Sequence, residues 1–343
     1  MRLLAILIGL TLIITQGAQA QVMLRAATFD PQGSPAAQGL QAFADTLRSC
    51  TNGQLYAEVF ADGTFGRPRE LVDQLINGSI DVAVVSASAL QPYYQSAGIL
   101  SAPLIFYNRR HWETALSGPV IKAIDDELAN SAGLRVLGFM GGEQLGILST
   151  SPITTPEDLE GQSIRVAGID ENIFKALGAR PVQTAFTEVF TALRTGAIDA
   201  TEATADFVTR TKAYEVASEF ATSNHRILTD LLVMNSAGIN KLSDDGRACL
   251  SRAAEAASST GRDAVVSIEQ AALAELSELG VVLRKIGNRP ALFDRARGAT
   301  SDIVSEFQAE KLYSLIMSSF TCPTWCGDSS CDDDECKACK VCE

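Results

Sequence analysis

Arg165 lies near the end of a short strand-like segment, where its side chain can meet an anion. Residues 163–166 (SIRV) alternate as a strand does, and Gly168 marks the bend that follows. In open α/β sheets, ligands bind outside the carboxyl ends of the strands. A guanidinium at such a place can hold a carboxylate with two parallel hydrogen bonds. The alternative is a structural ion pair, because a buried arginine is rarely left unpaired.

The sequence carries no recognisable catalytic set. Its two histidines, His111 and His225, do not have the spacing of a paired metal site. The chain also lacks a Gly-x-Ser-x-Gly motif and a phosphate-binding Gly-x-x-x-x-Gly-Lys motif. We therefore expect a binding protein without a cofactor, not an enzyme, and a structural role for His225.

Helices are expected on both sides of the Arg165 strand. Thr155 and Pro156, followed by two acidic residues, are typical of a helix start, which Gly161 ends early. Residues 186–193 predict a second helix, and residues 195–202 read as its end, a turn and a strand.

This stretch resembles the TRAP-transporter solute-binding proteins of the DctP type. The motifs that carry the resemblance are Gly161-Gln-Ser-Ile-Arg165-Val, Leu177-Gly-Ala-Arg-Pro181-Val, Glu188-Val-Phe-Thr-Ala-Leu193 and Gly196-Ala-Ile-Asp199-Ala-Thr-Glu202. It continues through Phe65-Gly66, Asn77-Gly78, Ala102-Pro103-Leu104-Ile105-Phe106, and His225 with Asn235 downstream. It covers residues 22–318.

The resemblance implies a ligand-binding site around one arginine. Arg165 is the expected carboxylate clamp, and the family pattern adds a set of neighbours around the ligand: Ser86, Phe186, Glu202, Asn235 and the loop 203–207, which includes Asp206 and Phe207. Asp206 and Phe207 suit a hydroxyl or amine beside an apolar face, although Phe207 is equally expected as core packing.

One position departs from the family pattern. Where the family often has a second arginine in a Gly-x-Arg element, this chain has Gln144. An amide can donate a hydrogen bond to a keto or hydroxyl oxygen, but it does not support a second ligand carboxylate. One arginine specifies a carboxylate and little else, so the sequence does not name the organic acid.

The order of elements predicts an α/β fold with two domains. Residues 80–85 are nearly continuously apolar, as in a strand covered on both faces, and strands alternate with helices. The resemblance implies a periplasmic-binding-protein fold with discontinuous domains, joined by crossovers and by a long bridging helix near 242–279. Domain I is assigned to 21–142 plus 231–270, and domain II to 143–230 plus 271–318.

The N-terminal end predicts export. Arg2, an apolar run and Ala18-Gln19-Ala20 form the three-part pattern of a secretory signal peptide over residues 1–20, with the cut after Ala20. An uncleaved anchor is the alternative. The expected location is the periplasm.

Composition argues against nucleic acid as a partner. The formal charge of the 343-residue chain is −13, and loss of Arg2 makes it −14, whereas phosphate binding needs clustered Lys and Arg. An anionic small molecule is still compatible, because recognition is local and surface charge is screened over about 8 to 10 Å.

The C-terminal segment 319–343 is acidic and holds six of the eight cysteines. These are Cys322, Cys326, Cys331, Cys336, Cys339 and Cys342. Export favours disulfides, although Cys336, Cys339 and Cys342 in overlapping Cys-x-x-Cys units can alternatively bind a thiophilic metal, and an unstructured segment is the third option. The remaining two, Cys50 and Cys249, either pair or are unrelated buried residues.

The sequence therefore predicts an extracytoplasmic receptor that binds a small organic acid by hinge closure. The resemblance adds delivery to the membrane subunits of a TRAP transporter. The alternative is an extracytoplasmic metal-binding or sensor protein that acts through its cysteine-rich tail.

Overall fold

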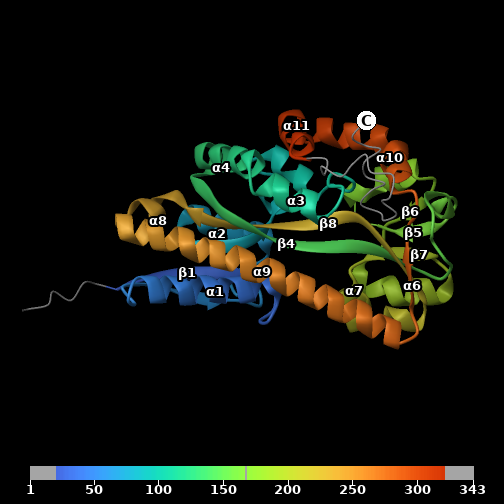
Figure 1. Cartoon of the computed structure of the whole chain (residues 1–343), viewed down its shortest axis with the longest axis horizontal. Helices are drawn as coiled ribbons and strands as arrows, with labels where there is room; N and C mark the ends of the chain where they lie inside the picture. The colour runs from blue at the N-terminus through green and yellow to red at the C-terminus, as the bar shows by residue number, and fades with distance from the viewer. Residues whose placement is uncertain (1–20, 167, 321–343) are drawn as a thin grey trace, which may run out of the picture.

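The computed structural model describes residues 21–166 and 168–320 (Figure 1). Its strands are β1 Val22–Thr28, β2 Leu55–Phe60, β3 Val82–Ser86, β4 Leu134–Ser149, β5 Ser163–Arg165, β6 Arg180–Val182, β7 Ala200–Ala203, β8 Glu219–Asn235 and β9 Val282–Lys285. Its α-helices are α1 Pro35–Cys50, α2 Pro68–Asn77, α3 Arg109–Leu116, α4 Pro119–Ala132, α5 Glu171–Ala176, α6 Val189–Thr195, α7 Ala205–Thr211, α8 Ser236–Asn240, α9 Asp244–Glu278, α10 Arg289–Glu306 and α11 Glu310–Ser318.

The strands form one mixed sheet in the order β2-β1-β3-β8-β4-β7-β5-β6, with β9 beside β8. Parallel pairs lie toward the two ends, β1 with β2 and β3 at one end and β5 with β6 and β7 at the other. The long strands β4 and β8 pair antiparallel in the middle and belong to both halves. The predicted α/β fold class is confirmed.

Helices cover both faces of the first half of the sheet. On β3, Val82 and Val84 join the core under α1 and α9, while Ala83 and Val85 join the core under α2, α3 and α4. Successive side chains of a strand point to opposite faces, so a strand covered on both faces must be apolar throughout. The apolar run at residues 80–85 has this physical cause.

The long helix α9 crosses the molecule diagonally and packs against both halves (Figure 1). Its first part packs against α1 through small residues, and Gly39 of α1 approaches so closely that a Cβ there would lie 2.8 Å from the carbonyl oxygen of Ala257. Its last part contributes Ala272 and Leu276 to a core with α6 and α7. The bridging helix implied by the resemblance is therefore present.

Most predicted elements appear close to their expected bounds. The strand predicted at 163–166 is β5. The helix α1 begins at Pro35, because Ser34 accepts a hydrogen bond from the amide of Ala37 and Pro35 takes the first helical position. The helix expected after Thr155 is one 3-10 turn, Pro156–Leu159. Gly161, in a left-handed conformation with φ of 74°, follows at once.

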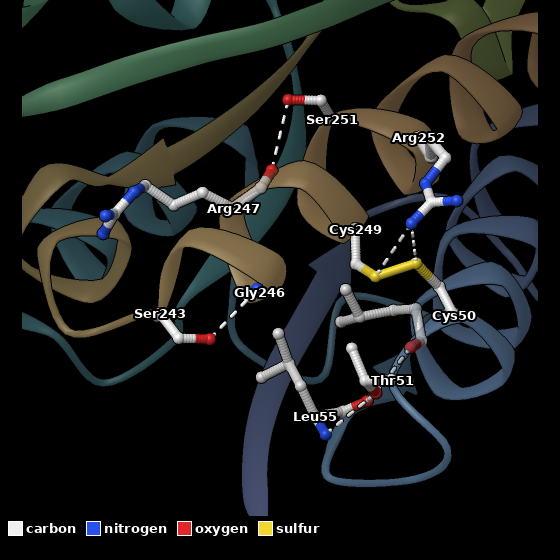
Figure 2. Close-up of a disulfide and its surroundings, with 10 residues drawn as sticks. Cys50, Thr51, Leu55, Ser243, Gly246, Arg247, Cys249, Ser251 and Arg252 are labelled. Carbon is white, nitrogen blue, oxygen red and sulfur yellow. Dashed lines mark hydrogen bonds between the residues drawn. A yellow bond between two sulfur atoms is a disulfide. The ribbon is translucent and has the colours of Figure 1, made fainter.

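A disulfide joins Cys50 at the end of α1 to Cys249 in α9 (Figure 2). The two Cα atoms are 5.8 Å apart, and 199 positions separate the residues in the sequence. The close packing of α1 on α9 brings the two cysteines together, so of the two alternatives for this pair, pairing is confirmed. The bond ties the start of the chain to the bridging helix.

Two predicted segments lie outside the described residues: the signal peptide, 1–20, and the tail with Cys336, Cys339 and Cys342. Within 21–166 and 168–320, none of the helices combines the length and apolar character needed to cross a membrane. The same residues contain no cluster of three or more His, Cys, Asp or Glu side chains arranged to hold a metal ion.

We expect the double variant Cys50→Ser/Cys249→Ser to be less stable than the wild type. Because the bond closes a loop across 199 positions, the chain-entropy relation gives a loss of about 5 kcal/mol in unfolding free energy. Urea denaturation of both proteins, with and without reductant, measures it. Reductant should lower the stability of the wild type toward that of the variant, and equal stability of the two oxidised proteins would contradict this role.

Candidate ligand-binding site

A cleft of about 580 Å³ lies between the two halves of the molecule, against the middle strands of the sheet. One wall comes from the loop after β1, the start of α1 and the end of β3; the facing wall comes from the β7–α7 connection, and β4, β8 and α9 supply the rest. Its polar lining residues are Asp30, Ser34, Ser86, Ser88, Ser101, Glu143, Thr204, Asp206, Arg210, Arg226, Thr229, Asp230 and Glu269.

A bulge in β4 directs Glu143 into this cleft. The register of β4 on β8 shifts between Gly141 and Gln144, and Gly141 has a φ of 91°. A Cβ on Gly141 would lie 2.7 Å from the carbonyl oxygen of Leu228, so only glycine fits. Bulges of this kind re-aim side chains next to binding sites.

Carboxylates dominate the half of the cleft near α1. Glu143 and Asp230 come from adjacent strands, and Asp30 joins them from the loop after β1. Desolvation, followed by the negative charges of Asp30 and Glu269, raises the pKa of Glu143 to about 7. Desolvation and the charges of Glu143 and Asp30 raise the pKa of Asp230 well above its usual range. The hydroxyl of Thr28 donates to Asp30 at 3.1 Å, whereas the Oε2 atom of Glu143 is buried without a hydrogen-bond partner.

Arg165 lies behind the cleft wall in a second charged cluster. Only 6% of the residue is exposed; its Nε donates to the carbonyl oxygen of Thr184 at 3.2 Å, and the ring of Phe186 covers the guanidinium at 3.8 Å. Its Nη1 is buried without a hydrogen-bond partner and lies 3.9 Å from the carboxylate of Glu202. Desolvation lowers the pKa of Arg165, opposed by the charge of Glu202.

His225 is a buried neutral neighbour of Glu202. Its Nε2 lies 3.4 Å from a carboxylate oxygen of Glu202, and its Nδ1 lies 2.7 Å from the hydroxyl of Ser223. Burial lowers the pKa of His225 to about 4. The ring therefore carries no charge at neutral pH, as expected for a structural histidine.

Asp170 and Arg226 complete this second cluster. Asp170 is fully buried, and its carboxylate accepts a hydrogen bond from Nη1 of Arg226 at 2.5 Å. Burial, followed by the charge of Glu202, raises the pKa of Asp170 to about 7, opposed by Arg226. Arg226 also lines the cleft, so it connects the two charged groups.

The sequence-predicted site residues fall into three places. Ser86 and Asp206 line the cleft, where Asp206 pairs with Arg210 at 2.7 Å. Arg165, Glu202 and Phe186 lie in the second cluster, with Phe207 packed edge-on against Phe186.

The remaining two predicted residues lie away from the lining of the cleft. Gln144 points to α9, where its side-chain amide donates to Glu269 at 3.4 Å. Asn235 accepts a hydrogen bond from the amide of Ala237 at the start of α8, and it donates to the carbonyl oxygen of Leu75.

Sequence reasoning missed Glu143, Asp230, Asp170 and Arg226. A usable signal exists for two of them, because residues 219–235 form one long strand and period-two alternation places Arg226, Leu228 and Asp230 on one side. Glu143 depends on the bulge, and Asp170 on a 3-10 turn after β5, so neither has a periodic signal.

A two-lobed α/β chain with a cleft between its lobes and arginines at that cleft is the architecture of an extracytoplasmic solute-binding protein. The comparisons with known proteins agree. Residues 26–309 match the family model DctP, described as bacterial extracellular solute-binding protein, family 7. The chain belongs to this family, and the resemblance seen in the sequence is confirmed.

Similar proteins share the length as well as the fold. A solute-binding protein of Sulfitobacter sp. strain NAS-14.1 is 28% identical over 308 residues, 89% of this chain and 93% of that protein. A TRAP periplasmic solute-binding protein of Rhodobacter sphaeroides in an apo open form has a TM-score of 0.83 at 23% identity, covering 88% of this chain and all of that one. One from Chromohalobacter salexigens with bound D-glucuronate has a TM-score of 0.74 at 25% identity, with 87% and 100% covered.

We expect Asp170 and His225 to affect the pH dependence of stability in opposite directions. Between the unfolded value of 3.8 and the folded value of about 7, folded Asp170 holds a proton that the unfolded chain releases, so its contribution falls as pH rises. Between 6.5 and about 4, unfolded His225 binds a proton that the folded chain excludes, so its contribution falls as pH drops.

Thermal unfolding of Asp170→Asn, His225→Gln and wild type from pH 4.5 to 7.5 measures this. Relative to wild type, the midpoint of Asp170→Asn should rise with pH, and that of His225→Gln should rise as pH falls. Profiles parallel to the wild type would refute the assignment.

Proposed function

We propose that this protein is a periplasmic receptor that binds a small polyhydroxylated organic acid, such as a sugar acid, in the cleft between its lobes. The observation that carries the proposal is the separation of basic and acidic side chains at the cleft. The guanidinium groups of Arg165 and Arg226 form one cluster with Glu202 and Asp170, and the carboxyl groups of Asp30, Glu143 and Asp230 lie apart from it, near α1, where Oε2 of Glu143 is buried without a partner.

The carboxylate and the hydroxyl groups of a sugar acid each have matching hydrogen-bond partners in the cleft. A ligand carboxylate meets guanidinium donors, while ligand hydroxyls donate to Asp30, Glu143 and Asp230. A simple alkyl acid would bring no hydrogen-bond donors to this part of the cleft and would leave Oε2 of Glu143 buried without a partner, which is costly. The D-glucuronate bound by the Chromohalobacter protein has both kinds of group.

Binding by hinge closure follows from the connections between the lobes. In this proposal, domain I comprises 21–142 plus 231–270 and domain II comprises 143–230 plus 271–318, so β4 and β8 carry the crossings. Closure excludes water from the cleft and strengthens the charged hydrogen bonds, and the ligand shifts the equilibrium by its preference for the closed form. Phe186, half-exposed over Arg165, would close over the bound carboxylate.

The physiological role proposed is delivery of the acid to the membrane subunits of a TRAP transporter. Export would use the signal peptide, cut after Ala20. The proposed binding residues are Arg165, Phe186, Ser86, Glu202, Asp206 and Phe207. Gln144 and Asn235, which lie away from the cleft lining, are included as supporting residues. The protein acts as a receptor without catalysis or cofactor. The comparisons do not favour the alternative of a metal-binding protein or sensor acting through its tail.

A ligand screen by thermal shift tests the proposal. The mature protein, residues 21–343, is heated with D-glucuronate, D-galacturonate, other sugar acids, keto acids and simple monocarboxylic acids. We expect a rise with sugar acids, since a ligand at 100 times its dissociation constant adds about 2.7 kcal/mol to stability. The rise should vanish in Arg165→Ala. A rise with none of the acids would contradict the proposal.

The carboxylate wall has its own test. Glu143→Gln keeps the size of the side chain but loses the charge that Glu143, with a pKa of about 7, carries at pH 8. At that pH, affinity for a sugar acid should fall about tenfold, in line with hydrogen bonds to charged groups. Affinity for an alkyl acid of similar length should stay the same or rise. Glu278→Gln, at the exposed end of α9, is the matched control, and isothermal titration calorimetry gives the affinities. Equal losses of affinity for both ligands would show that Glu143 does not bind the hydroxyl groups of the ligand.

A further inference from the structure

Arg226 is better placed than Arg165 to touch a ligand in this conformation. Both guanidiniums belong to one cluster, and the charge of Arg226 is among the causes that lower the pKa of Arg165. Arg226 lines the cleft, while Arg165 lies behind the wall under Phe186. The other arginine that lines the cleft, Arg210, is paired with Asp206 and has a side chain that is 66% exposed.

The guanidinium of Arg226 presents a free edge. Its Nη1 donates to Asp170, and its Nε is buried without a hydrogen-bond partner. In arginine, Nε–H and Nη2–H point the same way and form the edge that a carboxylate binds with two parallel bonds. Asp170 occupies Nη1, so the Nε–H of this edge is a buried donor without a partner in the protein.

Asp170 fixes the direction of that edge. It is fully buried at the end of a 3-10 turn, Gly168–Asp170, which follows the Arg165 strand. Arg226 pairs in register with Leu145 on β4, and the next pair joins Ile227 to Gln144. Arg226 therefore carries its guanidinium on β8, one residue pair along the β4–β8 ladder from Gln144. The side-chain amide of Gln144 already donates to Glu269.

We propose that Arg226 binds the carboxylate of the ligand through Nε and Nη2, held in position by Asp170, and acts beside Arg165 as a second guanidinium of the site. This inference rests on the proposed function, because it assigns a residue to the acid end of the same ligand. It also places the carboxylate on the β8 side of the cleft.

A bound carboxylate near Arg226 adds a negative charge beside Asp170. The charged groups around Asp170 are Arg226 and the mostly neutral His225 on β8, Glu202 on β7 and Arg165 on β5. Since burial and Glu202 already raise the pKa of Asp170 to about 7, the added anion favours its protonated form further. Ligand binding should therefore take up a proton at Asp170, and this contribution makes affinity fall as pH rises from 6 to 8.

Calorimetric titration of the mature protein with D-glucuronate at pH 6, 7 and 8 tests the inference. The variants are Arg226→Ala, Arg226→Lys, Asp170→Asn and the double variant Arg226→Ala/Asp170→Asn, which removes both charges and avoids an unpaired buried carboxylate. Arg297→Ala, at an exposed position of α10 outside the cleft lining, is the matched control for loss of one arginine. Circular dichroism and thermal melts confirm folding of each.

We expect Arg226→Ala and the double variant to bind at least tenfold more weakly, the equivalent of about 1.4 kcal/mol. Arg226→Lys, which keeps the charge but loses the two parallel donors, should fall in between, and Arg297→Ala should stay within about twofold of wild type. Asp170→Asn should flatten the pH dependence. Near wild-type affinity in the folded double variant would overturn this inference and leave the proposed function standing. Failure of the wild type to bind any sugar acid would overturn both.

Discussion

The antiparallel pairing of β4 with β8 is the constraint on which the site depends. These two strands pair from Leu134 opposite Asn235 to Ser149 opposite Glu219, and they are the strands that both halves of the sheet share. The cleft lies against them, with Glu143 projecting from one strand and Arg226 from the other. A shift of this ladder by one residue would turn every side chain to the opposite face, so the register also fixes the charges of the cleft.

Those charges explain how an acidic protein can receive an acid. The net charge of −13 is spread over the whole chain, and exposed charges are screened by salt within about 10 Å. In the cluster behind the cleft wall, Arg165 and Arg226 are held by Glu202 and the fully buried Asp170 in a desolvated setting. The part of the cleft near α1 carries the carboxyl groups of Asp30, Glu143 and Asp230, and it suits hydrogen-bond donors of the ligand. Local arrangement, not net charge, decides which end of a ligand goes where.

The sequence predicted the fold well because its signals are local. Apolar runs and glycine stops marked β3 and β5, and the family resemblance supplied the bridging helix α9 and the way in which the elements connect. The positions of the site residues were harder to predict from the sequence. Arg165 was singled out from its place at a strand end, and the structure puts it behind the cleft wall, beside Glu202. Gln144 turned toward α9 because a bulge shifts the register of β4, and Arg226 came to the cleft through pairing with a strand more than 70 residues away. Alternation along β8 shows that Arg226 and Asp230 share a face, but one sequence does not show which strand pairs with β8 or where a bulge interrupts the ladder.

A crystal structure of the mature protein with D-glucuronate would test the central claim most directly. The account predicts a closed cleft with the ligand carboxylate against the guanidiniums of Arg226 and Arg165, and ligand hydroxyls donating to Glu143 and Asp230. A ligand bound in the reverse orientation, or bound outside this cleft, would contradict it.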